Sequence, residues 1–185
     1  MKFVFITYLA LFITRGILEY ALKPRPLRPE ASPVRAGLFS YLLLVESYLV
    51  SGLWVAFLLW KEPMIDFRLY VLGILMFVLG VVGRASAFQE LGQNYSPYIV
   101  IASGGKLITT GIYSWIRHPL FSFQILEMLG FLCIKWSAVT IICLGLTALI
   151  IWRRIYTEED LLEKTYGEIF LSYKKRTRSV IPFVL

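Results

Sequence analysis

The sequence predicts an all-α integral membrane protein with about five transmembrane helices and a C-terminal amphipathic helix that covers a pocket on the cytosolic face. Hydrophobic residues make up 58% of the 185 residues and gather in long blocks, whereas soluble domains have roughly 45–50%. The net charge of +7 comes from Lys and Arg that cluster beside these blocks. This placement is typical of membrane topology and of contact with anionic lipid, and it argues against nucleic-acid binding.

Five apolar segments are candidate membrane spans, at about residues 3–22, 37–60, 68–88, 120–134 and 137–152. Each of the first three has the roughly 20 residues needed to cross the hydrocarbon core. The fourth is shorter, and only a tight turn separates it from the fifth, so these two should form an antiparallel helical hairpin. The first segment holds Arg15 and Glu19 and lacks a small-residue cleavage site, so we expect a retained helix and not a signal peptide.

Basic residues orient the predicted bundle. They gather in the first loop, in the third loop and after the last span, while the opposite side has only Lys2, Lys61, Arg68 and Lys135. Positive charge favours the cytosolic side, so we expect the N-terminus outside and the C-terminal tail in the cytosol, in a prokaryotic plasma membrane or the endoplasmic reticulum. The residues on the predicted cytosolic side are Lys23, Arg25, Arg28, Arg35, Lys106, Arg117, Arg153, Arg154, Lys164, Lys174, Lys175, Arg176 and Arg178.

After the last span, the pattern changes to that of an amphipathic helix. We expect this helix to begin as a continuation of the fifth span and to lean back over the cytosolic end of the bundle. Its inward stripe consists of residues at steps of three and four, namely Ile155, Glu159, Leu162, Tyr166, Ile169 and Tyr173.

Two polar pairs at helix ends are candidates for a functional site. Arg154 and Glu158 are four residues apart and project from the same side of one helix. His118 and Pro119 stand where a loop enters the fourth helix, and proline suits that position. Free amides of such a first turn can bind polar ligand groups. The plain alternatives are a surface ion pair and a helix-start turn that faces lipid head groups.

Other ionisable residues lie at membrane depth, where they usually pair within the bundle or line a water-filled cavity. Arg15 and Glu19 are one helical turn apart and should satisfy each other. Glu127 lies two turns beyond His118 and is a candidate substrate-binding residue at the border of the same cavity. Three glycines, Gly73, Gly80 and Gly83, favour close helix packing. Cys133 and Cys143 lie in apolar runs and are expected to be core residues, and no metal site is expected.

Several motifs follow one another between about residues 91 and 183. The first group comprises residues 91–96, 105–113 and 117–121, and the second follows the predicted hairpin. Together they resemble the isoprenylcysteine carboxyl methyltransferase family and the broader set of small membrane methyltransferases. The matching residues of the second group are Arg154, Glu158, Glu159, Leu162, Tyr166, Gly167, Tyr173, Lys174, Lys175, Ile181, Pro182 and Phe183.

The resemblance implies methylation of the C-terminal carboxylate of a prenylated cysteine, with S-adenosylmethionine as the cofactor. It implies that Arg154 is the catalytic residue at the substrate carboxylate and that Glu158 binds the cofactor. The family often has Tyr where this chain has Phe121, so a hydrogen bond from that hydroxyl is not expected here. The remaining cofactor contacts that the resemblance implies are Lys106, Leu107, Ile108, Tyr113, His118, Pro119, Leu120 and Phe121.

We therefore expect a single membrane domain over residues 1–185, with a three-helix N-terminal part (1–90) and a cofactor-binding catalytic region (91–185). The leading function is methyl transfer to an isoprenylcysteine carboxylate or a related lipidic carboxylate. The alternatives are a phospholipid N-methyltransferase, an NADPH-dependent sterol-type membrane reductase, and a non-catalytic scaffold or small transporter. The expected partners are a lipid-modified or lipidic small substrate and membrane lipids, with no nucleic acid and no obligate protein partner.

Overall fold

A computed structural model of the chain describes residues 2–24, 35–62, 64–101 and 105–180. Two parts of the sequence analysis fall outside these ranges. They are the first loop with its Arg25 and Arg28, and the last part of the family motif, residues 181–183.

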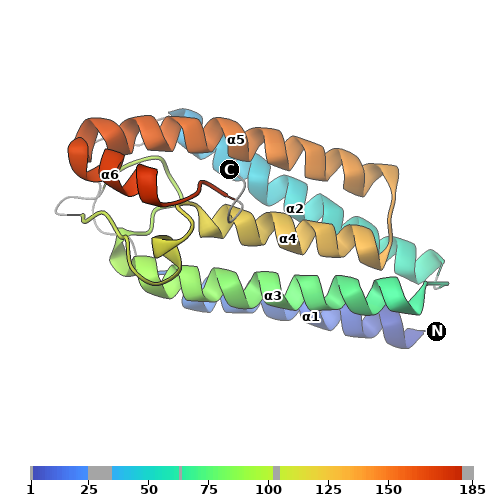
Figure 1. The fold of residues 1–185 in the computed structure, drawn as a ribbon. Coiled ribbons are helices and arrows are strands. Elements are labelled where there is room, and N and C mark those ends of the chain that lie inside the picture. Colours follow the sequence, from blue (N-terminus) through green and yellow to red (C-terminus); the bar gives the residue numbers. More distant parts are fainter. Residues whose placement is uncertain (1, 25–34, 63, 102–104, 181–185) are drawn as a thin grey trace.

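Five long helices form an elongated bundle, and a short sixth helix folds back at one end of it (Figure 1). Within the described ranges there is no β-strand, and the predicted all-α membrane fold is confirmed. The elements are α1 (Lys2–Leu22), α2 (Arg35–Lys61), α3 (Phe67–Leu91), the 3₁₀ helices η1 (Gly92–Asn94) and η2 (Gly111–Ser114), α4 (Pro119–Ile134), α5 (Ala138–Tyr166) and α6 (Glu168–Arg176).

Among the described residues, four helical segments are long and apolar enough to cross a membrane, so the chain is an integral membrane protein. α4 has 16 residues, which give it a length of about 24 Å. This is less than the roughly 30 Å of a hydrocarbon core. The fifth crossing therefore stays a prediction. The four segments are Phe3–Leu22, Gly37–Lys61, Phe67–Asn94 and Ala138–Tyr166.

The predicted hairpin of α4 and α5 is confirmed. Ser137 caps α5, and its side chain and that of Thr140 accept each other's backbone amides in a capping box. Lys135, in the turn, donates to the carbonyl oxygens of Glu62 (3.2 Å) and Met64 (3.1 Å). The α4–α5 turn and the α2–α3 connection therefore share one end of the bundle, opposite to α6 (Figure 1).

α4 packs along α3 through glycines. A Cβ atom at Gly73 would lie 2.6 Å from the carbonyl oxygen of Gly130, and one at Gly80 would lie 3.0 Å from that of Phe123. The predicted packing role of these glycines is confirmed. Further along, Arg84 donates from Nη1 to the carbonyl oxygen of Leu120 (2.9 Å). α4 begins at this level, whereas α3 continues to Leu91. The last turns of α3 therefore extend beyond the start of α4 and are not packed against it.

The membrane-depth charges neutralise one another inside the bundle. Arg15 and Glu19 form the predicted ion pair, and Glu19 also pairs with Arg84 Nη2 (3.0 Å). Glu127 is 0% exposed and lies 3.0 Å from Arg15 Nε and 3.6 Å from Arg84 Nε. The Tyr48 hydroxyl donates to the same carboxylate (2.6 Å). Two cations and two anions thus join α1, α3 and α4 at a depth where an unpaired charge is costly.

The predicted amphipathic helix is in fact two helices. α5 runs without interruption to Tyr166, and Gly167 then takes a left-handed backbone conformation with φ of 52°, which suits glycine. α6 folds back beside α5 beyond this break (Figure 1). The predicted stripe is wrong at Ile169, which is 68% exposed, whereas the next residue, Phe170, is buried.

Replacing Gly73 with Ala should destabilise the bundle, because the new Cβ would press on the Gly130 carbonyl of α4. Such overpacking typically costs about 1–3 kcal/mol. Gly145→Ala in α5 is the matched control, since a Cβ there meets nothing within 4 Å and alanine favours a helix. Thermal unfolding of the purified proteins in one detergent measures both effects. A Gly73→Ala protein as stable as the wild type would contradict this account of the α3–α4 contact.

Candidate functional site

A cavity of about 420 Å³ lies at the α6 end of the bundle. This volume is within the range of roughly 300–1,000 Å³ that is usual for small-molecule sites. All six helices and the loop between α3 and α4 contribute to its wall, and it occupies the end where α4 falls short of α3. The predicted site residues that line it are Lys106, Leu107, Ile108, Tyr113, His118, Leu120, Phe121, Arg154 and Glu158.

The structure places two predicted site residues elsewhere. Pro119 is buried in the first turn of α4, and Glu127 is held by Arg15 and Arg84, and neither lines the cavity. Arg15 and Arg84 themselves do line it. Glu127 therefore contributes to the cavity indirectly, because it pairs with two arginines of the cavity wall.

The loop before α4 is fixed by hydrogen bonds from two elements. Asn94, in η1, accepts from the Lys106 backbone amide (2.9 Å). Tyr166, in the last turn of α5, donates to the Gly105 carbonyl oxygen (3.0 Å). This segment therefore closes one side of the cavity, although its sequence predicts no regular structure.

The turn that leads into α4 pairs with the C-terminal tail. The backbone amides of Arg117 and His118 donate to the carbonyl oxygens of Arg178 (2.8 Å) and Ser179 (3.0 Å), as in a short parallel β-bridge. The amide of Phe121 donates to the His118 carbonyl oxygen (3.1 Å). Most amides of this first turn are thus used within the protein. We expected free backbone amides that could bind a ligand. Only the Leu120 amide of this turn has no hydrogen-bond partner in the described part of the chain.

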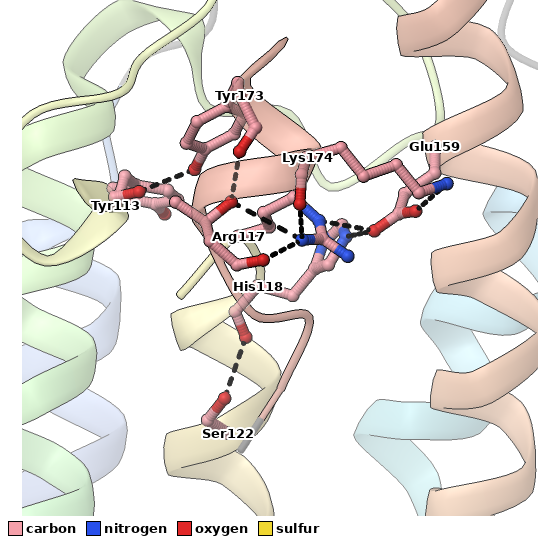
Figure 2. A network of polar contacts seen from close by, with 8 residues as sticks. Tyr113, Arg117, His118, Ser122, Glu159, Tyr173 and Lys174 are labelled. Carbon is pink, nitrogen blue, oxygen red and sulfur yellow. Dashed lines mark hydrogen bonds and ion pairs between the residues drawn. The ribbon is translucent and has the colours of Figure 1, made fainter. Parts of the chain in front are cut away.

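Glu158 and Glu159 are adjacent in sequence but have different surroundings. Glu158 is half-buried and lines the cavity. Glu159 lies outside the lining and accepts from three side chains (Figure 2). These donors are Arg117 Nε (2.8 Å), His118 Nε2 (3.2 Å) and Lys174 Nζ (2.8 Å).

Two buried tyrosines connect α6 to η2. The Tyr173 hydroxyl donates to the Tyr113 carbonyl oxygen (2.7 Å; Figure 2). Burial raises the pKa of Tyr113 well above its usual value, and the nearby Glu158 carboxylate adds to this shift. Burial also raises the pKa of Tyr173, to about 12. Both phenols therefore keep their protons at neutral pH, so they act as hydrogen-bond donors and not as bases.

Arg154 is a buried cation with neutral partners. It is 6% exposed, and it donates from Nη1 to the Gly37 carbonyl oxygen and Ser40 Oγ (both 3.0 Å) and from Nη2 to the Pro97 carbonyl oxygen (2.6 Å). Its Nε is buried and has no hydrogen-bond partner, and no carboxylate forms an ion pair with it among the residues that the structure describes. The alternative of a surface ion pair with Glu158 is therefore wrong.

Phe121 lies between two of these groups. Its ring stacks against that of His118, with centroids 6.0 Å apart, and the Arg154 guanidinium carbon is 5.8 Å from its centroid. Phe121 therefore packs the site, which is the role that remains for it without a hydroxyl.

On one side, the cavity reaches the surface between α1 and α2. Gly16, Tyr20 and Leu49 line it there, and Tyr20 is 88% exposed. All three belong to helices long enough to cross a membrane.

Sequence reasoning missed several residues that shape the site. It placed Glu159 in the inward stripe but gave it no partners, and it listed Lys174 only among the cytosolic basic residues and the residues of the family motif. It also gave no role to Asn94 or to the α2 residues Tyr41 and Leu44, which line the cavity. No local signal reveals these contacts, because each partner lies far away in the sequence.

Comparisons with known proteins agree with this architecture. The chain is 32% identical over 166 residues to protein-S-isoprenylcysteine O-methyltransferase of Homo sapiens, covering 83% of this chain and 57% of the relative. The enzyme of that name from Schizosaccharomyces pombe is 32% identical over 126 residues (64% of this chain, 52% of the relative). Protein-S-isoprenylcysteine O-methyltransferase B of Arabidopsis thaliana is 31% identical over 121 residues, with 60% and 58% covered.

A solved structure shares the fold. It is described as the eukaryotic intramembrane Ras methyltransferase ICMT without a monobody, and it matches with a TM-score of 0.62 and 23% identity over 77% of this chain and 52% of that one. The chain spans little more than half the length of these relatives. Residues 71–164 match the isoprenylcysteine carboxyl methyltransferase family. This match covers half of the chain and includes the lining residues of the cavity between the end of α3 and α5. The chain therefore belongs to the isoprenylcysteine carboxyl methyltransferase family.

Proposed function

We propose that the chain is an S-adenosylmethionine-dependent methyltransferase whose acceptor is the carboxylate of an isoprenylcysteine or of a related lipidic molecule. The observation that carries this proposal is Arg154, a cation that lines the cavity with neutral partners only. A buried cation without a counterion favours an anionic ligand strongly. The planar guanidinium suits a carboxylate, to which it can donate two hydrogen bonds.

The other wall of the cavity fits the methyl donor. Glu158 offers a carboxylate to a cationic group, and Tyr113, also in the lining, is an un-ionised phenol. Leu107, Ile108 and Phe121 supply apolar surface. When bound, S-adenosylmethionine supplies an activated methyl group on a sulfonium, and its transfer to a carboxylate gives an ester and a thioether.

The residues present suit a carboxylate acceptor. A carboxylate is ionised at neutral pH, so methylation needs no general base. Arg154 would hold its charge in a poorly hydrated site, and the enzyme's main contribution would be alignment of the two reactants. An amine acceptor would need a base, and Tyr113 cannot be one because its pKa is raised.

The two parts of the chain would interact with different parts of the reactants. We infer that residues 1–90 admit the lipid part of the acceptor, because the mouth between α1 and α2 would face lipid, and that residues 91–185 hold the methyl donor and, at Arg154, the acceptor carboxylate. We also place the α6 end in the cytosol, because Arg153, Lys175, Arg176 and Arg178 are exposed there. Their charge would favour contact with anionic membrane lipids.

The function is tested with the purified protein in detergent. Binding of radiolabelled S-adenosylmethionine is compared with binding of NADPH, and release of S-adenosylhomocysteine is followed with prenylcysteine analogues and with phospholipids. We expect binding of S-adenosylmethionine and turnover with the prenylcysteine carboxylates. Binding of NADPH alone would overturn the proposal in favour of a reductase, and turnover only with phospholipid amines would overturn the choice of acceptor.

Arg154→Ala should abolish most carboxyl methylation, because the acceptor carboxylate loses its counterion. Loss of one charge-assisted contact at a reacting centre typically lowers the rate about 10²–10³-fold. Arg153→Ala is the matched control, since Arg153 is the preceding residue and is exposed. Initial rates of S-adenosylhomocysteine release measure both variants. If Arg154→Ala retained the wild-type rate with a prenylcysteine, Arg154 would not be the carboxylate contact.

Gly16→Leu should obstruct the lipid-facing mouth without straining the fold, because a Cβ at Gly16 meets nothing within 4 Å. We expect the KM of the prenylated acceptor to rise about tenfold, on the order of the loss of a few buried methylenes. Affinity for the methyl donor should stay unchanged. Gly145→Leu, at a site that is equally open and outside the cavity lining, is the control. Equal acceptor KM values in the two variants would exclude access between α1 and α2.

A further inference from the structure

We propose that Glu159 is a positioning residue of this site, in that its carboxylate selects the tautomer of His118 and ties α6 to the turn before α4. The effect on the methyl donor rests on the proposed function, whereas the effect on His118 does not.

The carboxylate is shared between two parts of the chain (Figure 2). Its Oε1 lies 2.8 Å from Arg117 Nε and 3.2 Å from His118 Nε2, both in the turn before α4. Its Oε2 lies 2.8 Å from Lys174 Nζ, on α6. Two cations surround this one carboxylate, so it stays ionised and can only accept hydrogen bonds.

An acceptor at this position determines which nitrogen of His118 carries the proton. Nε2 must donate to the Glu159 carboxylate. In a neutral imidazole, Nδ1 is then left as an acceptor. Nδ1 has no hydrogen-bond partner within the described ranges, and His118 lines the cavity with its ring held against Phe121. The site therefore offers a ligand an acceptor nitrogen of fixed orientation.

The two neighbouring glutamates thus have separate tasks. Successive residues of an α-helix point about 100° apart, so Glu158 borders the cavity while Glu159 turns toward the α4 turn and α6. Glu158 would meet the ligand directly. Glu159 would act through His118, without a place in the cavity lining.

The Glu159 carboxylate also binds α6, which covers one side of the cavity. Phe170 and Tyr173 of α6 line the cavity, and Lys174 on the same helix pairs with Glu159. Arg117 strengthens this link, because its Nη1 donates to the Thr177 carbonyl oxygen (2.5 Å) just after α6. Loss of the carboxylate would therefore free His118 and loosen α6 at the same time.

The test uses the fact that His118 is the single histidine of the chain. Protein labelled with [¹⁵N]histidine and purified in detergent gives one pair of ring nitrogen signals, and these report the tautomer directly. For the neutral ring of the wild type we expect the proton on Nε2. A proton on Nδ1 would overturn the proposal, whatever the activity of the protein.

Two variants separate positioning from mere stability. Glu159→Ala should give a mixture of both tautomers and raise the KM of the methyl donor about tenfold, as expected when a charge-assisted hydrogen bond is lost, with little change in the acceptor KM. Glu159→Gln should keep the wild-type tautomer, because the amide oxygen can still accept from His118. The amide NH₂ group would then face the Lys174 ammonium group and could not accept its hydrogen bond. We therefore expect limited proteolysis to cleave α6 more readily in this variant.

Glu158→Gln is the control, since it should weaken donor binding and leave the His118 tautomer unchanged. If Glu159→Ala kept both the wild-type tautomer and the wild-type donor KM, Glu159 would not be a positioning residue. Should Glu159→Ala fail to fold, a Glu159→Gln protein with the proton on Nδ1 would overturn the proposal equally. Absence of methyl transfer in every protein, with the expected tautomers, would contradict the proposed function alone.

Discussion

A charge inside a membrane-spanning bundle must be neutralised within the protein, and this constraint organises the structure. Arg15 and Arg84 satisfy it with Glu19 and Glu127, so four side chains fasten α1, α3 and α4 together. Arg154 is different, because neutral oxygen atoms hold it in place. The first group has the pattern of a structural network. Arg154 has the pattern of a binding-site residue whose anionic partner would be a ligand.

The difference in helix length explains where that ligand can lie. α4 has 16 residues and α3 has 25, and their contact begins near Arg84, where α4 starts. The volume left beside the end of α3 is enclosed by a loop, by the long α5 and by α6, which the break at Gly167 turns back toward the bundle. A continuous α5 would project away from the cavity, so the break is what provides a cover. Glu159 then holds this cover to the start of α4.

The sequence was sufficient for the fold class and for most of the cavity wall. Hydrophobic blocks located the long helices, and the family resemblance implied nine of the lining residues, including Arg154 and Glu158. It missed the break between α5 and α6, because apolar residues at steps of three and four do not reveal the positive φ of Gly167. It also placed Glu127 at the cavity as a candidate substrate-binding residue and gave Glu159 no partners. Both are carboxylates in good helical positions, and only the three-dimensional neighbours show that they bind arginine, lysine or histidine of the protein instead of a ligand.

These assignments bear on the nature of the acceptor. A neutral amine would need a group that takes its proton, and two of the titratable groups near the cavity are unsuited to that task. Tyr113 keeps its proton because its pKa is raised, and Glu127 is neutralised by two arginines. Glu158 lines the cavity and forms no ion pair with the described residues, so it could pair with a cationic donor. A carboxylate acceptor needs no proton removed, and its negative charge would pair with Arg154, a buried cation that has no ion pair within the described ranges. The proposed acceptor therefore follows from the distribution of charge in the cavity, as well as from the family to which the chain belongs.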